Sequence, residues 1–479
     1  MNCWSRYPAF YYGLALICGV SLYYGIWFPI LIGFTGKTIC RIVGYFLLSC
    51  ALYASIVNLT DKNKIECSTN GTGYFQINKI RKSNNFGKKS LIYEGIIKTF
   101  VTSDKTYYDI RCFIQVYNKT KINKGNCDYV LNGNIIPISN NLYKMNVEKW
   151  TPINNTYSTS ELRFTLKNNL KSYLKKQIKD FDTYSFFAAI GSGETENKYL
   201  AIKFNQSGLR HLLAISGFHY SCLIMIFGFF LNLFLQKKLS IIVLIILTSI
   251  YFTFIGESPS LNRAWMSTLI YLIGSLIYKN SCALNALGVG IIFSITLDPF
   301  CILNVGYQLS YAATFAILTI YPYLERKIRI ILPKRQFKDV ENMNYLNKHG
   351  YILSSIVRLS IGLTLSVTII CIPISLYHFN YFPLSSIFFN LFFPFVVTTA
   401  MIALIVSLSL PYIGEFILHF CESYMRFWLD VIFYGQWQMT FLYGSIGLKL
   451  LCYVISAIIV AGLYGEEQKY QLTLKQRNL

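Results

Sequence analysis

Long apolar runs, separated by short polar connections, dominate the chain. A helix needs about 20 residues to cross the hydrocarbon of a bilayer, so the runs at 10–34 and 42–59 predict two crossings or three short ones. After residue 212 the runs recur densely, and we expect spans near 212–235, 239–255, 264–278, 283–297, 305–321, 351–376, 384–410 and 444–464. The pattern predicts an α-helical polytopic membrane protein, with about 10–12 membrane helices at this span length.

A polar segment interrupts this pattern at 60–160, where the composition shifts to Lys, Asn, Thr and Tyr. Apolar and polar residues alternate from Tyr108 to Tyr117, which is the pattern of a half-buried strand. Weaker strand patterns cover 91–100, 129–138 and 142–150. Four or five short strands separated by turns predict a small inserted β-barrel, similar to an OB-fold, or a sandwich.

The remaining segments complete the predicted organisation. Leucines recur every four residues among lysines from Glu161 to Phe181, which predicts a basic amphipathic helix over 161–182. That helix would lie on the membrane surface or pack between the insert and the membrane helices. We expect transmembrane helices at 1–59, the β-domain at 60–160, a multi-span domain at 183–465 with a cytoplasmic loop at 322–350, and a cytoplasmic tail at 466–479.

Charge indicates how the chain is oriented. Lys and Arg occur at Lys237, Lys238, Lys279 and in the 326–348 loop, whereas the alternate connections at 256–262 and 298–304 have none. The basic connections should therefore be cytoplasmic, which places the insert on the outer side. The net charge is +22, and half of it lies at 60–182, which contains 21 Lys and Arg residues and 10 Asp and Glu residues.

Basic and aromatic residues lie close together along the predicted strands of the insert. Cations that follow phosphates and rings that stack on bases are the features of an unspecific single-strand binder. A merely solubilising surface would show the same composition. The candidates are Lys98, Phe100, Lys105, Tyr107, Arg111, Phe113, Tyr117 and Lys119.

Three of the thirteen cysteines, Cys67, Cys112 and Cys127, lie in the insert. On an oxidising outer side two of them could pair, and Cys112 with Cys127 is our candidate disulfide. The chain has five histidines without an HxH pair, no CxxC spacing and no P-loop. We therefore expect no catalytic residue, cofactor or metal, and no ATP hydrolysis by this chain.

Two polar stretches interrupt apolar sequence. SGLRHLLAISGFH at 207–219 places Arg, His and Ser at the start of a span, where such groups either serve a polar path or only cap and contact helices. Glu415, His419, Glu422, Arg426 and Asp430 recur at helical spacing. This second polar face would lie in the membrane interface, which we favour, or line an aqueous path.

Four segments, in order, resemble signatures of the ComEC/Rec2 competence family. They are SGLRHLLAISGFH at 207–219, GESPSLNRAW at 256–265, DPFCILNVGYQLSYAATFAI at 298–317, and PISLYHFNYFPLSSIFFNLFFPF at 373–395. The resemblance implies an inner-membrane, multi-pass channel that takes up single-stranded DNA during natural transformation. It also implies that the insert is an OB-fold-like domain outside the membrane.

The resemblance gives pore or helix-contact roles to ten residues, although for Arg263 a structural ion pair or a snorkelling side chain is an equal alternative. The ten are Arg210, His211, Ser216, Gly217, His219, Arg263, Gln308, Ser310, His378 and Asn390. Two departures accompany the match. The chain ends at Leu479 without the family's usual metallo-β-lactamase-like nuclease domain, and AAIGSGETEN stands where members usually carry a Gly-Asp pair.

The expected partners follow from this resemblance. They are single-stranded DNA, a cytoplasmic DNA-translocating motor or strand-trapping proteins, an outer DNA receptor, a separate nuclease and membrane lipids. The alternative function is a membrane enzyme or carrier for lipid-linked or anionic small substrates, with the insert binding anionic headgroups. A third interpretation is a degenerate paralogue that serves only in assembly.

Overall fold

The computed structural model separates the chain into two compact units. One comprises Met1–Ser55, Ile178–Phe252 and Glu257–Leu479, and the other comprises Ile56–Gln177 with Thr253–Gly256. The structure describes residues 7–23, 44, 48–53, 65, 67–85, 88–103, 105–117, 127–139, 142–153, 156, 158–256, 258–277, 282–335, 337–434 and 440–442. Helices dominate the first unit and a β-barrel dominates the second, which confirms the predicted fold class.

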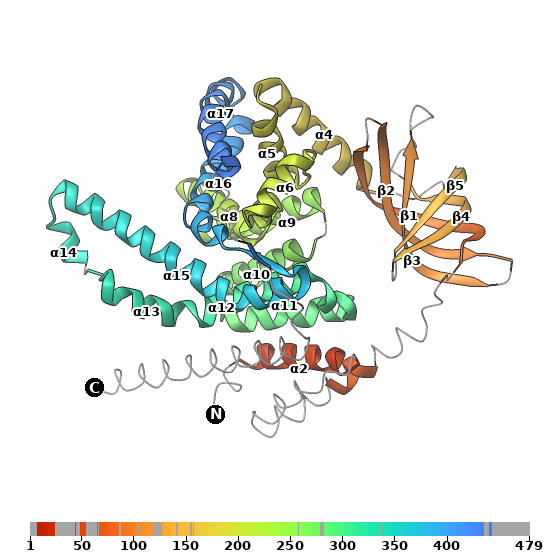
Figure 1. The fold of residues 1–479 in the computed structure, drawn as a ribbon, viewed down its shortest axis with the longest axis horizontal. Coiled ribbons are helices and arrows are strands. Elements are labelled where there is room, and N and C mark those ends of the chain that lie inside the picture. Colours follow the sequence, from red (N-terminus) through yellow and green to blue (C-terminus); the bar gives the residue numbers. More distant parts are fainter. Residues whose placement is uncertain are drawn as a thin grey trace. The chain divides into compact units, whose positions relative to one another are not determined.

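The barrel closes five strands in the order β1-β2-β3-β5-β4 (Figure 1). The strands are β1 (Thr69–Asn85), β2 (Lys88–Val101), β3 (Thr106–Tyr117), β4 (Tyr129–Ser139) and β5 (Leu142–Pro152). β1 pairs antiparallel with both β2 and β4, and β3 meets β5 in the one parallel pairing of the barrel. A five-stranded barrel of this kind is the architecture of the OB-fold.

Two bulges explain where the strand patterns in the sequence fail. The register between β1 and β2 shifts between Ile77 and Lys79, so the alternation of buried residues in β1, the longest strand, is interrupted after Ile77. It shifts again where Tyr74 pairs with Thr99 and Phe75 with Ile97, which leaves Lys98 as an extra residue. The side chains of β2 that follow Lys98 therefore point to the opposite face from the one they would take in a regular strand.

The barrel has its own hydrophobic core, in which aromatic rings from several strands meet. Phe75, Phe100 and Leu131 are fully buried. Trp150 makes edge contacts with the rings of Phe75, Tyr93 and Tyr129, with centroids 5.2–6.4 Å apart. Such aromatic pairs add stabilisation beyond the area they bury.

The helix α4 (Ser160–Gln177) completes the barrel unit and uses its cations as hydrogen-bond donors. Arg163 donates to the carbonyls of Thr253 and Asn78 at 2.8 and 3.1 Å, and Lys167 donates to the carbonyl of Ile255 at 2.9 Å. Lys167 is buried, whereas Leu162 is exposed. We predicted a single helix over 161–182. The structure instead has two helices in this segment, because α4 ends at Gln177 and a second helix begins at Phe181.

The helical unit contains four of the predicted membrane segments as helices of spanning length. Within the described residues, four helices are long and apolar enough to span a bilayer: α8 (Gly217–Phe234), α9 (Lys237–Ile255), α15 (Tyr345–Phe379) and α16 (Ser385–Ser409). The other helices are α2 (Pro8–Tyr23), α5 (Phe181–Ser192), α6 (Lys198–Gln206), α7 (Arg210–Leu213), α10 (Pro259–Leu276), α11 (Ala283–Leu297), α12 (Val305–Thr319), α13 (Tyr321–Ile331), α14 (Phe337–Glu341) and α17 (Pro411–Tyr434). The span predicted at 444–464 lies outside the described residues.

Three differences from the predicted layout stand out. The 322–350 loop is largely helical, because it contains α14, nearly all of α13 and the first turns of α15. A 3-10 helix, η2 (Pro299–Leu303), joins α11 to α12, and short strands β6 (Tyr381–Pro383) and β7 (Thr440–Leu442) pair with each other. The N-terminal α2 packs on α11, and both belong to a core shared with α12 and α15.

Gly95 provides a test of the barrel, because a Cβ there would lie 2.1 Å from the carbonyl oxygen of Gln76 and 2.8 Å from the ring of Phe75. We expect Gly95→Ala to destabilise the barrel by about 1–3 kcal/mol through overpacking. Hydrogen exchange of the β1 and β2 amides measures this effect. Gly350→Ala is the control, since nothing lies within 4 Å of a Cβ at that position. Equal exchange in both variants would contradict the packing argument.

Candidate functional site in the helical unit

The stretch at 207–219 forms a turn and a short helix in front of the first long apolar helix. α6 ends at Gln206, Gly208 adopts a left-handed φ of 74°, α7 covers Arg210–Leu213, and α8 starts at Gly217. A Cβ on Gly208 would lie 2.4 Å from the Cβ of Ser386 at the start of α16. Both the positive φ and this close approach require glycine. Arg210 and His211 are exposed on α7.

Ser216 and His219 cap the N-terminus of α8. The backbone N–H of Ser216 donates to Nδ1 of His219 at 3.2 Å, and the Ser216 hydroxyl lies 3.1 Å from the same nitrogen. Reciprocal contacts of this kind satisfy polar groups that the first helical turn leaves free. His219 is fully buried, and its Nε2 has no hydrogen-bond partner within the described chain. Its contacts with Ser216 are therefore those of a helix cap.

Arg263 brings three of the four sequence motifs together. Its Nε donates to the hydroxyl of Ser310 at 2.7 Å, and its guanidinium carbon lies 5.9 Å from the ring centroid of Tyr311. A Cβ on Gly217 would lie 2.9 Å from Nη2 of Arg263. Gly217 thus leaves the space that the guanidinium occupies. No carboxylate in the part of the chain that the structure describes pairs with Arg263.

A second polar contact joins α12 to α15. His378 Nε2 lies 2.7 Å from Oε1 of Gln308, whose amide nitrogen donates to the carbonyl of Ile302 at 2.8 Å. Gln308 and Ser310 lie two residues apart on α12, so this helix carries partners of both Arg263 and His378. Asn390 is half-buried on α16.

The sequence argument missed Tyr311. Its ring faces Arg263, its hydroxyl lies 3.2 Å from that of Ser294 on α11, and its ring centroid lies 4.3 Å from that of Tyr307. The sequence did carry a signal for this residue. Tyr307 and Tyr311 are four residues apart, which places them on one face of a helix, in a motif that also holds Gln308 and Ser310. Among the described residues, no group of three His, Cys, Asp or Glu side chains is placed to hold a metal ion.

The structure separates the DNA-binding candidates of the barrel into exposed and buried residues. Lys98, Lys105 and Arg111 are exposed. Phe113 is half-buried, opposite Glu94 on β2 and Lys144 on β5. The side chain of Tyr117 and all of Lys119 lie outside the described residues.

One candidate was placed wrongly. Phe100 is fully buried in the barrel core, because the bulge at Lys98 turns it inward. Tyr107 is half-buried beside it, with ring centroids 6.5 Å apart. The exposed aromatic ring on β3 is instead Tyr108, at 65% exposure.

The expected disulfide between Cys112 and Cys127 is not formed in this structure, where both are free thiols. The side chain of Cys112 points into the barrel core from β3 and is buried there. Burial raises the pKa of the Cys112 thiol to about 12, although a backbone hydrogen bond at Met145 acts in the opposite direction. Cys127 lies at the edge of the same core and contacts the hydroxyl of Tyr129.

The polar face of α17 binds the segment between α4 and α5. The carboxylate of Glu422 accepts hydrogen bonds from the backbone N–H groups of Lys179 and Asp180 at 3.0 and 2.7 Å. Arg426 pairs with Asp180 at 3.0 Å, and Asp180 also caps α5 by accepting from the N–H of Thr183 at 2.8 Å. Glu422 is buried, so at least this part of the face contacts protein.

These features define a helical membrane protein with an inserted β-barrel and a polar cluster where separate sequence motifs meet. The family described as Competence protein matches residues 189–468, more than half of the chain, and the chain belongs to this family. The match confirms the resemblance to ComEC/Rec2 proteins and associates the chain with competence.

A curated relative is ComE operon protein 3 of Bacillus subtilis (strain 168). It is 27% identical over 212 residues, which cover 43% of this chain and 24% of the relative. The chain thus spans about a quarter of the length of that protein. No solved structure matches the chain.

The Asp180 pair provides a test at the start of α5. Burial raises the pKa of Asp180, but hydrogen bonds from Thr183 and Arg426 outweigh it and lower the pKa below its usual value. The stabilisation is therefore present above about pH 3.9, the usual pKa of Asp, and is lost as the pH falls through the lowered value.

We expect Asp180→Asn to keep the helix cap but lose the pair with Arg426. This pair lies at the surface, where water screens an ion pair and its contribution to stability is small. The thermal midpoint of the purified protein in detergent should fall slightly at neutral pH, and the difference from wild type should vanish in acid. Glu148→Gln, at an exposed carboxylate on β5, is the control. A difference that persists unchanged in acid would contradict the assignment.

Proposed function

We propose that the chain carries single-stranded DNA inward across the cytoplasmic membrane as a multi-pass uptake channel. The observation that supports this most directly is the cluster around Arg263, where the family motifs on α8, α10 and α12 meet. Membership of the Competence protein family supports the same conclusion. A channel for a polyanion needs polar groups inside a membrane protein that are placed to replace its hydration.

Arg263 suits contact with a phosphate. A guanidinium away from water is costly unless it is paired, and Ser310 supplies only one neutral acceptor. A DNA phosphate would offer a charged partner, because the planar guanidinium can donate two parallel hydrogen bonds to its two free oxygens. Tyr311 holds the guanidinium from one side, and Gly217 leaves the space that its Nη2 occupies.

The other motif residues would form the polar wall of the path. Gln308 and His378 hold each other by a hydrogen bond, so both side chains are fixed where α12 meets α15. Ser216 and His219 set the start of α8 beside Arg263. Arg210 and His211 are exposed on α7 and would add further polar groups to the path.

The barrel would collect the strand on the outer side. Lys98 and Arg111 are near neighbours on β2 and β3, because Arg111 pairs with Ile96, two residues before Lys98. Lys105, just before β3, adds a cation, and Tyr108, near the start of β3, adds an exposed ring. Such a surface attracts phosphates through counterion release and reads no sequence.

We assign no chemical step to the chain itself. We propose as partners a cytoplasmic motor or proteins that trap the arriving strand, and a nuclease that degrades the second strand. An outer DNA receptor would deliver the substrate to the barrel. These partners remain part of the proposal.

Arg263→Gln tests the channel. We expect uptake of labelled DNA into cells to fall by about 10-fold or more at equal protein level, because a hydrogen bond to a charged group contributes about 1.5–3 kcal/mol. Arg263→Lys should recover part of the uptake, since it keeps the charge but loses the two-pronged geometry.

Ser260→Ala is the matched control for Arg263, since Ser260 lies on the same helix and donates to the carbonyl of Ile215. It should leave uptake near wild type. Normal uptake by Arg263→Gln at equal protein level would reduce Arg263 to a packing role.

The double variant Lys98→Gln with Arg111→Gln tests the barrel. We expect the full-length protein in detergent to bind a single-stranded oligonucleotide more weakly, with a salt dependence reduced by about 0.7 in log–log slope for each lost phosphate contact. Lys149→Gln, at an exposed lysine on β5, should show a smaller change. An unchanged slope in the double variant would remove these two residues from the binding surface.

A further inference from the structure

The helices α13 and α14, with the first turns of α15, form an arm that the proposed DNA path does not use. α13 lies beside α15 (Figure 1), and the ring of Tyr321 lies 2.9 Å from where a Cβ on Gly362 would be. At 1.5 Å per residue the 35 residues of α15 extend about 50 Å, compared with about 30 Å of bilayer hydrocarbon. Part of α15 must therefore lie outside the hydrocarbon.

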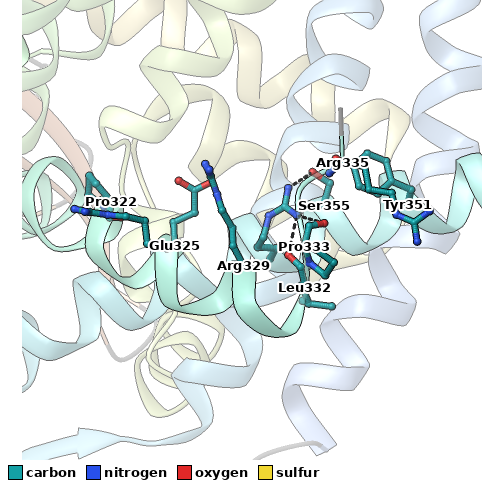
Figure 2. Close-up of polar contacts among 10 residues, drawn as sticks. Pro322, Glu325, Arg329, Leu332, Pro333, Arg335, Tyr351 and Ser355 are labelled. Carbon is teal, nitrogen blue, oxygen red and sulfur yellow. Dashed lines mark hydrogen bonds and ion pairs between the residues drawn. The ribbon is translucent and has the colours of Figure 1, made fainter. Parts of the chain in front are cut away.

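The arm is held in a defined geometry by a buried cation. Arg358 on α15 donates to the carbonyls of Leu332 and Pro333 at 3.1 and 3.2 Å, and to the hydroxyl of Ser355 at 3.0 Å (Figure 2). The backbone N–H of Arg335 donates to the hydroxyl of Tyr351 at 3.2 Å. Because Arg358 satisfies the carbonyls at the end of α13, the two helices are fixed against each other.

The exposed face of this arm combines cations with large apolar side chains. Ile330 and Ile331 at the end of α13 are 78% and 81% exposed, and Leu346 at the start of α15 is 83% exposed. Exposed cations lie among them: Arg326, Lys327, Lys334, Arg335 and Lys348. Of the α13 cations, Arg329 is already paired with Glu325 at 2.6 Å.

We propose that this arm binds the anionic phospholipid surface of the cytoplasmic leaflet. The loop that contains it is one of the basic connections that the charge distribution assigns to the cytoplasmic side. Aliphatic side chains of this kind bury in the boundary between headgroups and acyl chains, and the cations beside them attract anionic headgroups.

Charge complementarity and the kind of apolar residue together favour lipid as the occupant. Single-stranded nucleic acid is bound by stacked aromatic rings, whereas the most exposed apolar residues here are Ile330, Ile331 and Leu346. The exposed tyrosines, Tyr323 and Tyr345, are the residue type that gathers at membrane interfaces. The arm would thus anchor one end of α15 to the membrane surface independently of the Arg263 cluster.

Hydrogen exchange of the full-length protein in nanodiscs tests this inference. We expect the amides of α13 and of the first turns of α15 to exchange more slowly in discs of phosphatidylcholine with phosphatidylglycerol than in discs of phosphatidylcholine alone. The variant Arg326→Gln with Lys327→Gln should lose this protection by roughly fivefold for each cation removed, the effect of one basic residue at an anionic surface. Ile330→Gln with Ile331→Gln should reduce the protection in both kinds of disc.

Lys237→Gln with Lys238→Gln is the control, because it removes the same charge from another basic connection on the same side. Unchanged exchange in α16 shows that each variant is folded. Equal exchange of the arm in both kinds of disc would overturn the inference. Protection that arises only on adding a single-stranded oligonucleotide would also overturn it and assign the arm to DNA.

Discussion

The cost of placing a guanidinium inside a helical membrane unit organises the centre of this protein. Arg263 must be satisfied by protein groups or by a ligand, because lipid offers no partner. Ser310 and Tyr311 come from α12 to meet it, and Gly217 at the start of α8 leaves room for it. The starts of three helices are thereby fixed around one charge that no carboxylate in the described chain neutralises.

Charged side chains also satisfy backbone groups at helix ends in both units. Arg163 and Lys167 satisfy carbonyls at the end of α9, Arg358 satisfies those at the end of α13, and Glu422 accepts the free N–H groups before α5. Helix ends leave backbone groups without partners, and here charged side chains complete them. Several charges that a sequence would count as surface therefore have structural roles.

Much of the architecture could be predicted from hydrophobic periodicity. Apolar runs located α8, α9, α15 and α16, and the alternation at 108–117 located β3. Prediction failed where local geometry broke the period. One bulge interrupted the alternation in β1, and another turned Phe100 into the core. The helix predicted over 161–182 became two helices because Asp180 caps a new one.

The sequence by itself determined the class of the protein, its barrel insert and the motifs that resemble a competence family, because these depend on composition, period and short patterns. Only the tertiary structure decided which motif residues meet. Arg263, Ser310 and Gly217 lie far apart in the chain, and so do Gln308 and His378. Such contacts depend on how helices pack, which local sequence does not encode, and for the same reason Tyr311 and the cap formed by Arg358 became visible only in the fold.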